Sequence, residues 1–167
     1  HPILGERNTI KNQMKNLLKF LLKINKKIYW IYSNNDYGYD LIVNKLNSLK
    51  YDKIKIIKNL ERKKFLSLLK NSKGLIGNSS CGIIEASIYH LPVINIGNRQ
   101  NGRKQTQNII NCKSLYTELI RAFKIINKKN FIKKKKIKNP YFKKNSCEKI
   151  FRLIFKYKKN SKIFEKY

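Results

Sequence analysis

Apolar and polar residues follow two distinct periods along the first 126 positions of the chain. Between residues 10 and 22 the apolar side chains recur three and four positions apart, which predicts a helix with one buried stripe. The run 28–32 is rich in aromatic and β-branched residues and predicts a strand that ends at the polar residues 33–36. The same reasoning predicts strands at 54–57, 73–76 and 93–96 and helices at 38–49, 61–71, 83–89 and 114–126.

This order of short strands and helices predicts an α/β fold. Strands that alternate with helices at close spacing indicate βαβ units, so we expect a doubly wound parallel sheet. The α/β domain is predicted to span residues 1–128. Residues 129–167 are strongly basic and are interpreted as a linker followed by a C-terminal helix over 144–157, with the last ten residues frayed.

The chain is strongly basic. Its 167 residues include 39 Lys and Arg against 9 Asp and Glu, a formal net charge of +30. Such an excess is typical of proteins that bind nucleic acid or other acidic polymers. Because the excess is nearly all lysine and is spread along the chain, we interpret it mainly as a composition bias at surface positions. A non-catalytic basic domain that binds nucleic acid or an acidic polymer remains the alternative, although aromatic and basic residues are not interleaved as in such domains.

Cysteine usage limits the cofactors and the compartment. Cys81, Cys112 and Cys147 lie far apart, and an odd number without short spacings argues against a disulfide framework or a zinc site. This pattern favours a reducing, cytoplasmic location. No run of about 18 apolar residues is present, so we predict no membrane span. We expect no metal and no other cofactor.

A glycine- and serine-rich loop directly before a predicted helix is the main candidate for chemistry. Its residues 77–82 follow a predicted strand, and ligands of open α/β sheets bind beyond the carboxyl ends of the strands. Ser79 and Ser80 offer hydroxyl donors next to the helix start, and Glu85 offers a carboxylate that can accept both hydroxyls of a ribose. The alternative is purely structural, with a serine as N-cap and Glu85 completing a capping box.

Two arginines follow the strand at 93–96. Arg99 and Arg103 are four residues apart and would face the same way on one helical turn. Arginine binds phosphate bidentately, so the pair favours a diphosphate ligand, whereas a solvated basic face is the alternative. The glycine spacing of segment 97–104 is that of a P-loop, but Arg103 and Lys104 replace its lysine and its Ser or Thr. ATP hydrolysis is therefore not predicted.

The loop after the first predicted strand adds polar residues on the same side of the sheet. Asn34 and Asp36 end the strand at 28–32, and either could contact a ligand or form an ordinary Asx turn. His1 is a possible general acid or base, or a phosphate donor, but a single histidine carries no interpretation alone.

Together these segments resemble the hydrolysing UDP-N-acetylglucosamine 2-epimerases. The resemblance is carried by Gly77–Glu85 followed by Pro92–Arg103, a long and specific pattern. It extends to His1–Pro2, Ser33–Gly38, Phe65–Leu69 and Asn139–Tyr141, and so covers nearly the whole chain. It implies the C-terminal, nucleotide-binding half of a two-domain glycosyltransferase-B fold, with the family's N-terminal domain expected to be absent from this sequence.

The resemblance also implies roles for individual residues. Ser79 and Ser80 would bind the diphosphate, Glu85 the ribose hydroxyls and Arg99 the phosphates; Arg103 is added on geometry alone. The remaining implied contacts are Asn59 and Leu60 near the uracil, Asn34 near the substrate, and His1 as the active-site histidine.

The implied reaction converts UDP-N-acetylglucosamine and water to N-acetylmannosamine and UDP, through anti elimination of UDP and hydration at C2, for sialic acid biosynthesis. The acid and base carboxylates would come from the absent domain, so we expect this segment alone to be inactive. A UDP-2,4-diacetamido sugar is the alternative substrate. When full length, the protein is expected to be a homo-oligomer.

Two departures from the family pattern are visible. Phe142, Lys143 and Lys144 stand where the family has Gly-Asp-Gly, which alters the loop geometry expected there. The resemblance also implies a strand ahead of His1, which this sequence does not include. The domain 1–128 is therefore expected to be incomplete at its N-terminus, to expose strand edges and to be marginally stable or to need a partner polypeptide.

Overall fold

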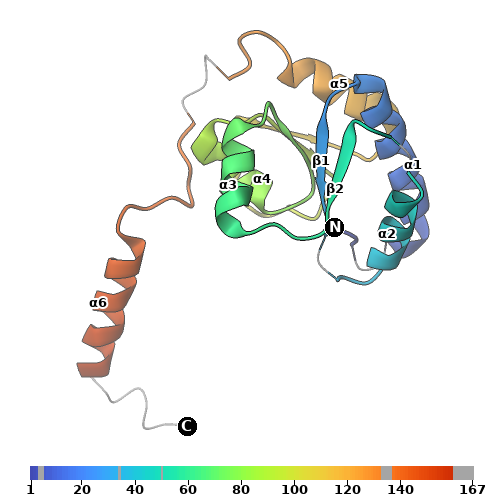
Figure 1. The fold of residues 1–167 in the computed structure, drawn as a ribbon. Coiled ribbons are helices and arrows are strands. Elements are labelled where there is room, and N and C mark those ends of the chain that lie inside the picture. The colour runs from blue at the N-terminus through green and yellow to red at the C-terminus, as the bar shows by residue number, and fades with distance from the viewer. Residues whose placement is uncertain (4–5, 34, 50, 133–136, 160–167) are drawn as a thin grey trace.

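The computed structural model describes residues 1–3, 6–33, 35–49, 51–132 and 137–159, so Asn34 and the lysine run 133–136 lie outside the described residues. Figure 1 shows the chain as a ribbon. Its elements in order are α1 (Arg7–Ile24), β1 (Ile28–Ile31), α2 (Tyr39–Asn47), β2 (Ile54–Ile57), α3 (Arg62–Asn71), β3 (Leu75–Gly77), α4 (Cys81–Ile84), the 3₁₀ helix η1 (Ala86–Tyr89), β4 (Val93–Ile96), β5 (Ile109–Cys112), α5 (Tyr116–Ile126) and α6 (Ser146–Lys159).

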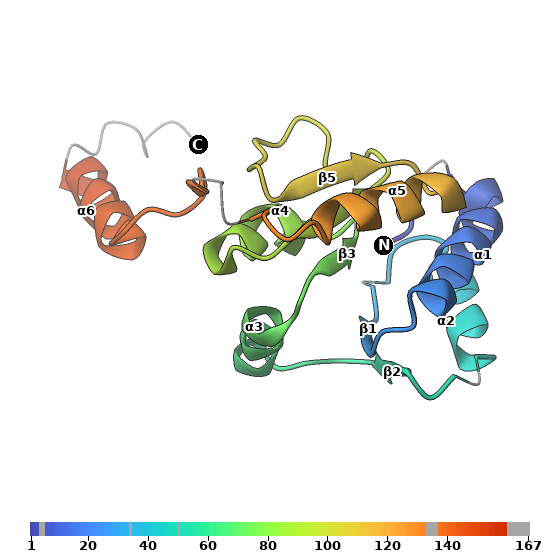
Figure 2. The ribbon, with the colours of Figure 1, turned by 90° about the horizontal axis from the view of Figure 1, so that it is seen from above.

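All strand pairs in the described part of the chain are parallel, which confirms the predicted α/β class. β1 pairs with β2 in a two-stranded sheet, and β3, β4 and β5 form a three-stranded sheet in that order. The sequence predicted a single sheet, whereas the structure has two hydrogen-bonded sheets side by side (Figure 2). The carboxyl ends of the strands, beyond which ligands of open α/β sheets bind, therefore form two groups, one for each sheet.

Strand β5 is the one element that the hydrophobic pattern did not predict. Only two adjacent isoleucines mark it, and polar residues flank them on both sides. The strand forms because tertiary pairing with β4 satisfies its backbone, from Val93 opposite Ile109 to Ile96 opposite Cys112. Its first and last residues are buried, so local sequence is overridden here by the neighbouring strand.

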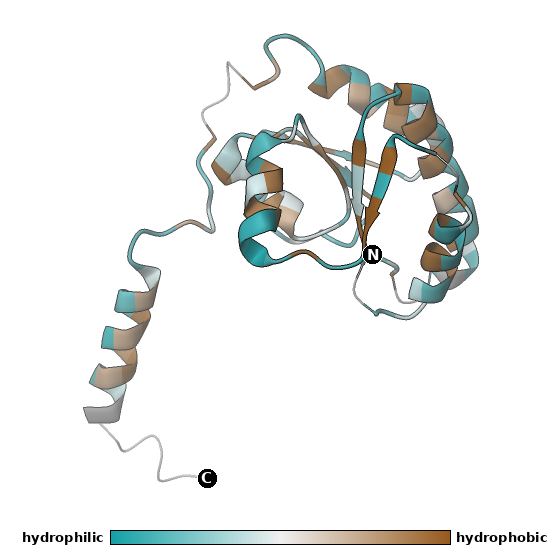
Figure 3. Cartoon of the chain, viewed as in Figure 1, coloured by the Kyte–Doolittle hydropathy of each residue, from teal (hydrophilic) through white to brown (hydrophobic). Residues whose placement is uncertain are grey.

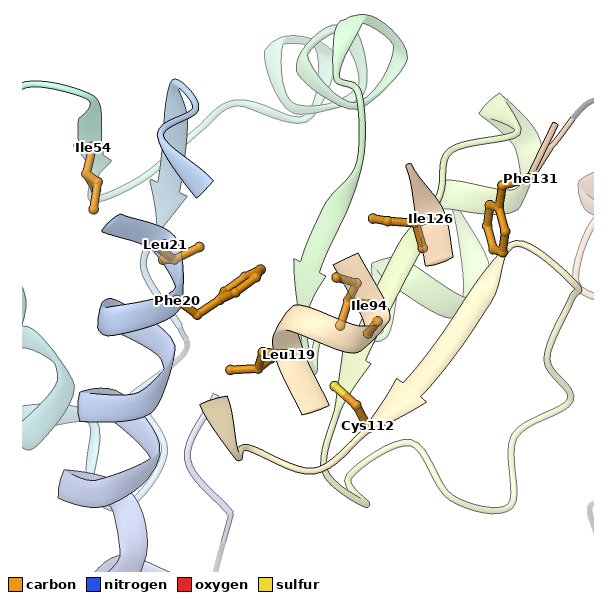
Figure 4. Packing of buried hydrophobic residues seen from close by; sticks show 9 residues of the cluster. Phe20, Leu21, Ile54, Ile94, Cys112, Leu119, Ile126 and Phe131 are labelled. Atoms are coloured by element: carbon orange, nitrogen blue, oxygen red, sulfur yellow. The ribbon is translucent and has the colours of Figure 1, made fainter. Parts of the chain in front are cut away.

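The main core lies where α1 and α5 pack against the strands. Phe20 of α1 and Leu119 of α5 are fully buried, and the fully buried Ile94 of β4 joins them (Figure 4). The rings of Phe20 and Phe123 meet edge to face with 5.7 Å between centroids. Smaller clusters fill the space around α4 and between α1 and α2. The burial of these side chains thus holds α1 and α5 against the strands.

Helix α6 spans Ser146–Lys159, close to the helix expected over 144–157. Figures 1 and 2 show it apart from the α/β body. Its apolar side chains are exposed, as Figure 3 shows by hydropathy; they include Ile150, Phe151, Leu153, Ile154, Phe155 and Tyr157. Among the described helices, none combines the length and the hydropathy that crossing a membrane requires.

Candidate functional site

The loops that follow β1, β3 and β4 converge near the N-terminus of the chain. Gly77 ends β3 with a φ of 149°, in the region that favours glycine, and turns the chain into residues 78–80 ahead of α4. Because the strands are parallel, the loop after β4 reaches the same edge of its sheet. The predicted segments 77–82 and 97–103 are therefore neighbours in the structure.

The helix after the serines is shorter than predicted. The sequence predicted one helix over 83–89, whereas α4 has four residues and continues as the 3₁₀ helix η1. A single turn aligns few peptide dipoles, so its positive end contributes little to anion binding. Most of the positive charge at this edge must come from side chains.

The two serines do not form a capping box within the described residues. Ser80 is the N-cap of α4 and makes no side-chain capping hydrogen bond there. The Ser79 Oγ accepts only a long hydrogen bond, at 3.4 Å, from the Cys81 N–H. Both side chains are half-buried at the start of α4. Ser80 therefore occupies the N-cap position that the structural alternative assigned to a serine, but without the side-chain hydrogen bond of a capping box.

Asn78 links this loop to the start of the chain. Its Nδ2 donates to the His1 carbonyl oxygen at 2.7 Å, and its Oδ1 accepts from the His1 backbone nitrogen at 2.7 Å. These two hydrogen bonds join residues 77 positions apart. Sequence reasoning missed this role, because asparagine is abundant throughout the chain.

Arg99 lies at the centre of the site. Its Nη2 is 3.7 Å from the Asp36 Oδ2, and its Nη1 donates to the Asn78 carbonyl oxygen at 3.4 Å. The His1 Nδ1 is also 3.7 Å from the same Asp36 oxygen. The predicted residues His1 and Arg99 are therefore brought together, with the Asp36 carboxylate between two groups that can carry positive charge.

Gln100 holds the loop at residues 78–80 through a buried side chain. It is 2% exposed, and its Nε2 donates to the Asn78 carbonyl oxygen at 2.9 Å. Its Oε1 is buried without a hydrogen-bond partner in the described structure, as are Ser33 Oγ and Asp36 Oδ2. Ser33 Oγ and Gln100 Oε1 thus lack partners among the described residues, whereas Asp36 Oδ2 has the two basic groups at 3.7 Å, although buried polar groups are normally hydrogen-bonded.

Glu85 is held by an ion pair. Its Oε1 accepts from the Arg62 Nη1 at 2.8 Å; the Glu85 side chain is 17% exposed and the Arg62 side chain 64%. Arg62 begins α3, and the predicted uracil contacts Asn59 and Leu60 lie just ahead of it, exposed and half-buried respectively. The structure therefore places the loop before α3 beside the carboxylate, through a residue that sequence reasoning did not identify.

Arg103 is not placed with Arg99. The segment 99–103 forms turns, not the predicted helical turn, and Gly102 has a φ of 78°. Arg103 is exposed, whereas Arg99 is half-buried.

The C-terminal segment also reaches the site, because Asn139 Nδ2 donates to the Ile84 carbonyl oxygen of α4 at 2.7 Å. The predicted contact Asn34 lies outside the described residues.

Comparison with curated proteins gives several similar sequences. The chain is 32% identical over 169 residues to the UDP-N,N'-diacetylbacillosamine 2-epimerase (hydrolyzing) of Legionella pneumophila, covering 99% of this chain and 44% of that protein. It is 35% identical over 110 residues to the UDP-N-acetylglucosamine 2-epimerase of Neisseria meningitidis, covering 66% of this chain and 29% of that protein. The chain thus spans less than half the length of these relatives.

Comparison with solved structures supports the fold. A crystal structure of the UDP-GlcNAc 2-epimerase of Methanocaldococcus jannaschii, in complex with UDP-GlcNAc and UDP, matches with a TM-score of 0.70 at 24% identity. The match covers 91% of this chain and 43% of that chain. It confirms the predicted likeness to one domain of the glycosyltransferase-B architecture.

A family model supplies the assignment. The model described as UDP-N-acetylglucosamine 2-epimerase matches residues 3–155, which is most of the chain. The match includes the serine loop, Glu85 and Arg99, the same segments on which the sequence resemblance was based. The chain therefore belongs to the UDP-N-acetylglucosamine 2-epimerase family.

Proposed function

We propose that this chain is the UDP-binding half of a hydrolysing UDP-sugar 2-epimerase. One observation carries the proposal: the Arg99 guanidinium contacts the loop that presents Ser79 and Ser80, although 19 residues separate Arg99 from Ser80 in sequence. An arginine and two hydroxyls on one loop edge form a donor set suited to a diphosphate. The α/β domain 1–128 would form this site, and residues 129–167 would be a basic linker and terminal helix.

Arg99 is suited to bind phosphate because its present partners hold it weakly. Its contacts with Asp36 and Asn78 are 3.7 Å and 3.4 Å long, outside the range of a short charge-assisted hydrogen bond. A diphosphate oxygen would replace these contacts with shorter ones. As UDP departs, negative charge grows on it, and a preorganised donor of this kind contributes about 3–4 kcal/mol in comparable sites.

Glu85 would receive the ribose. A carboxylate can accept from both hydroxyls of a diol, and the 2.8 Å pair with Arg62 fixes where the Glu85 Oε1 lies. Asn59 and Leu60, just ahead of Arg62, would then border the uracil. Asn34 and Arg103 complete the proposed set of UDP contacts.

His1 would act next to the departing diphosphate, as an acid, a base or a phosphate donor. The His1 Nδ1 lies 3.7 Å from the Asp36 Oδ2, beside the Arg99 guanidinium that would bind the diphosphate. Asn78 positions the backbone of His1 through two hydrogen bonds.

The reaction would begin when a base removes the proton at C2 while the C1–oxygen bond breaks and UDP leaves with the electron pair. Water then adds across the resulting double bond, with inversion at C2, and releases the free 2-epimeric sugar. General acid and base groups are needed for both steps. We expect these carboxylates from the remainder of the enzyme, which makes this segment alone inactive.

The proposed substrate is UDP-N-acetylglucosamine, which would give N-acetylmannosamine for sialic acid synthesis. A UDP-2,4-diacetamido sugar is the alternative, because the names of the relatives in Legionella and in Campylobacter jejuni specify N,N'-diacetylbacillosamine. The enzyme would act in the cytoplasm as a homo-oligomer when full length.

Calorimetric titration of the chain with UDP tests the proposal. Arg99→Ala and Ser80→Ala should each weaken binding about ten-fold or more, the loss expected for one charge-assisted hydrogen bond. Arg152→Ala on α6 and Ser67→Ala on α3 remove the same groups from exposed positions and serve as matched controls. Circular dichroism should stay unchanged in all four variants.

A mixed-sequence oligonucleotide provides the comparison for the basic-domain alternative. Its binding would fall steeply as salt is raised and would not depend on Arg99. Absence of UDP binding together with tight, salt-sensitive oligonucleotide binding would replace the proposed function with that alternative.

A further inference from the structure

The Glu85 carboxylate is held by a side chain from a different helix. Arg62 begins α3, 23 residues earlier in the chain, and its Nη1 donates to the Glu85 Oε1 at 2.8 Å. The side chains differ in burial, since that of Glu85 is 17% exposed and that of Arg62 is 64% exposed. A carboxylate has about four acceptor positions on its two oxygens. The hydrogen bond from Arg62 therefore leaves Glu85 able to accept further hydrogen bonds from a ligand.

The backbone around Glu85 is fixed independently of Arg62. The Glu85 N–H donates to the Cys81 carbonyl oxygen at 3.0 Å. Directly ahead of Glu85, the Ile84 carbonyl oxygen accepts from Asn139 Nδ2 at 2.7 Å. These contacts hold the main chain but leave the side-chain torsions of Glu85 free to choose among several rotamers. The Arg62 contact acts on this remaining freedom, which decides where the carboxylate points.

The elements that carry the ion pair are joined by apolar packing. Leu69 of α3, Ile83 of α4 and Ala86 of η1 belong to one buried cluster and are 4%, 0% and 0% exposed. Phe65, which follows Arg62 in the first turns of α3, packs against the same cluster. Ion pairs at the surface contribute little to stability, so this burial, and not the pair, holds α3 beside α4. Removal of the Arg62 guanidinium should therefore leave the fold intact.

Arg62 also connects two parts of the proposed nucleotide site. The segment 58–61 leads directly into α3 and contains Asn59 and Leu60, the residues expected near the uracil. The Arg62 guanidinium contacts Glu85, the residue expected to accept the ribose hydroxyls. Uracil and ribose are covalently joined in a nucleotide. A contact that fixes Glu85 relative to the segment 58–61 therefore also sets the spacing between the two subsites.

We propose that Arg62 is a positioning residue for Glu85 and thereby determines selectivity for ribose over 2′-deoxyribose in the bound nucleoside diphosphate. This inference rests on the proposed function, because Glu85 must be the group that receives the ribose. A hydrogen bond to a hydroxyl is directional, so an acceptor that is already held in place gains more from it. Without Arg62, the Glu85 side chain would have to be ordered when ribose binds, and the lost entropy would reduce affinity. A 2′-deoxyribose has one hydroxyl fewer and gains less from the ordered carboxylate.

Calorimetric titration with UDP and with 2′-deoxy-UDP tests this assignment. Arg62→Met removes the guanidinium and keeps an apolar stem, whereas Arg62→Lys keeps a positive charge without the planar fork. Lys64→Met is the matched control, because Lys64 is exposed in the same part of α3 and its Nζ lies 3.7 Å from the Glu61 Oε2. The control removes one positive charge two residues away, so it reports the general attraction of the protein for an anionic ligand.

Arg62→Met should weaken UDP binding by about three- to ten-fold, the coupling typical of residues in contact, and 2′-deoxy-UDP binding by less than about two-fold. The preference for UDP should therefore fall. Arg62→Lys should restore part of the preference, and Lys64→Met should leave it unchanged. In a Glu85→Gln background, Arg62→Met should not lower the preference further, because the carboxylate that Arg62 positions is gone.

The possible outcomes distinguish this inference from the proposed function. UDP binding that is weakened by Arg99→Ala but is unchanged or strengthened by Arg62→Met overturns the inference alone. Equal weakening of UDP and 2′-deoxy-UDP by Arg62→Met also overturns it, because Arg62 would then act on the diphosphate or on the fold. Absence of UDP binding to the unaltered chain overturns the proposed function and this inference with it.

Discussion

Replacing Gln100 by glutamate should make the stability of the domain depend on pH. The Gln100 Nε2 donates to the Asn78 carbonyl oxygen at 2.9 Å from a position that is 2% exposed. A carboxylate of the same shape would place an oxygen against that carbonyl oxygen, whereas the protonated acid can still donate its O–H. Burial therefore favours the neutral form and raises the pKa of the introduced carboxyl.

The sign and size of the effect follow from this shift. The folded variant holds its proton more tightly than the unfolded chain, so stability is retained below the unfolded pKa of about 4.3 and lost as the pH rises. The loss is about 1.4 kcal/mol for each pH unit until the folded carboxyl titrates, or about 3 kcal/mol over two units. The positive charge of Arg99 reduces this loss of stability, because it attracts the introduced carboxylate; the Arg99 Nη1 lies 3.4 Å from the same Asn78 carbonyl oxygen.

Urea denaturation at about pH 4.5 and pH 7.5 measures this difference. The matched control is Gln105→Glu, because Gln105 is exposed and its Oε1 accepts from Asn111 at 2.8 Å, a role that a carboxylate also fills. The Gln100→Glu variant should lose stability between the two pH values relative to the wild-type chain, and the control should not. Equal stability of both variants at the higher pH would refute the reasoning.

Three further predictions concern the core, a backbone turn and the thiols. Phe20→Ala should destabilise the fold by about 3–5 kcal/mol in urea denaturation, whereas Phe151→Ala, at 60% exposed, should change it by less than about 0.5 kcal/mol. Gly38→Ala should cost about 1–2 kcal/mol in the same assay, because φ is 96° there and a methyl group would meet a side chain of α1 at 2.6 Å. Burial raises the pKa of Cys112 to about 11, so below that pH its thiol stays protonated; peptide mapping after alkylation should find exposed Cys147 modified first, and Cys112 faster as the pH rises.

Hydrophobic periodicity predicted most of the fold because most elements bury one regular face. The stripe at residues 10–22 became α1, and the apolar run at 93–96 became strand β4, whose first three residues are buried. Strand β5 escaped prediction because its pairing partner, not its own pattern, stabilises it. The separation of the strands into two sheets was also invisible to periodicity, since that depends on which strands are neighbours.

Local pattern also misjudged backbone detail around the site. A helix over 83–89 was predicted, but the chain tightens to a 3₁₀ turn at Ala86 and leaves Glu85 between the two. Arg99 and Arg103 were expected on one face of a helical turn, but Gly102 adopts a left-handed conformation and separates them. In both cases the local backbone geometry, which periodicity does not report, differs from a regular α-helical turn.

The site itself is assembled by topology. Parallel strands bring their carboxyl ends to one edge, which is why the loops at 33–36, 77–80 and 97–103 could be expected to meet. The contacts that fix their geometry are different in kind: one Asn78 side chain both donates to and accepts from the backbone of His1, and its carbonyl oxygen receives Arg99 and Gln100. An amide that bonds in both directions at once has no sequence signature. The sequence can therefore suggest the groups that would contact the diphosphate. The role of Asn78, which links His1, Arg99 and Gln100, emerges only from the three-dimensional arrangement.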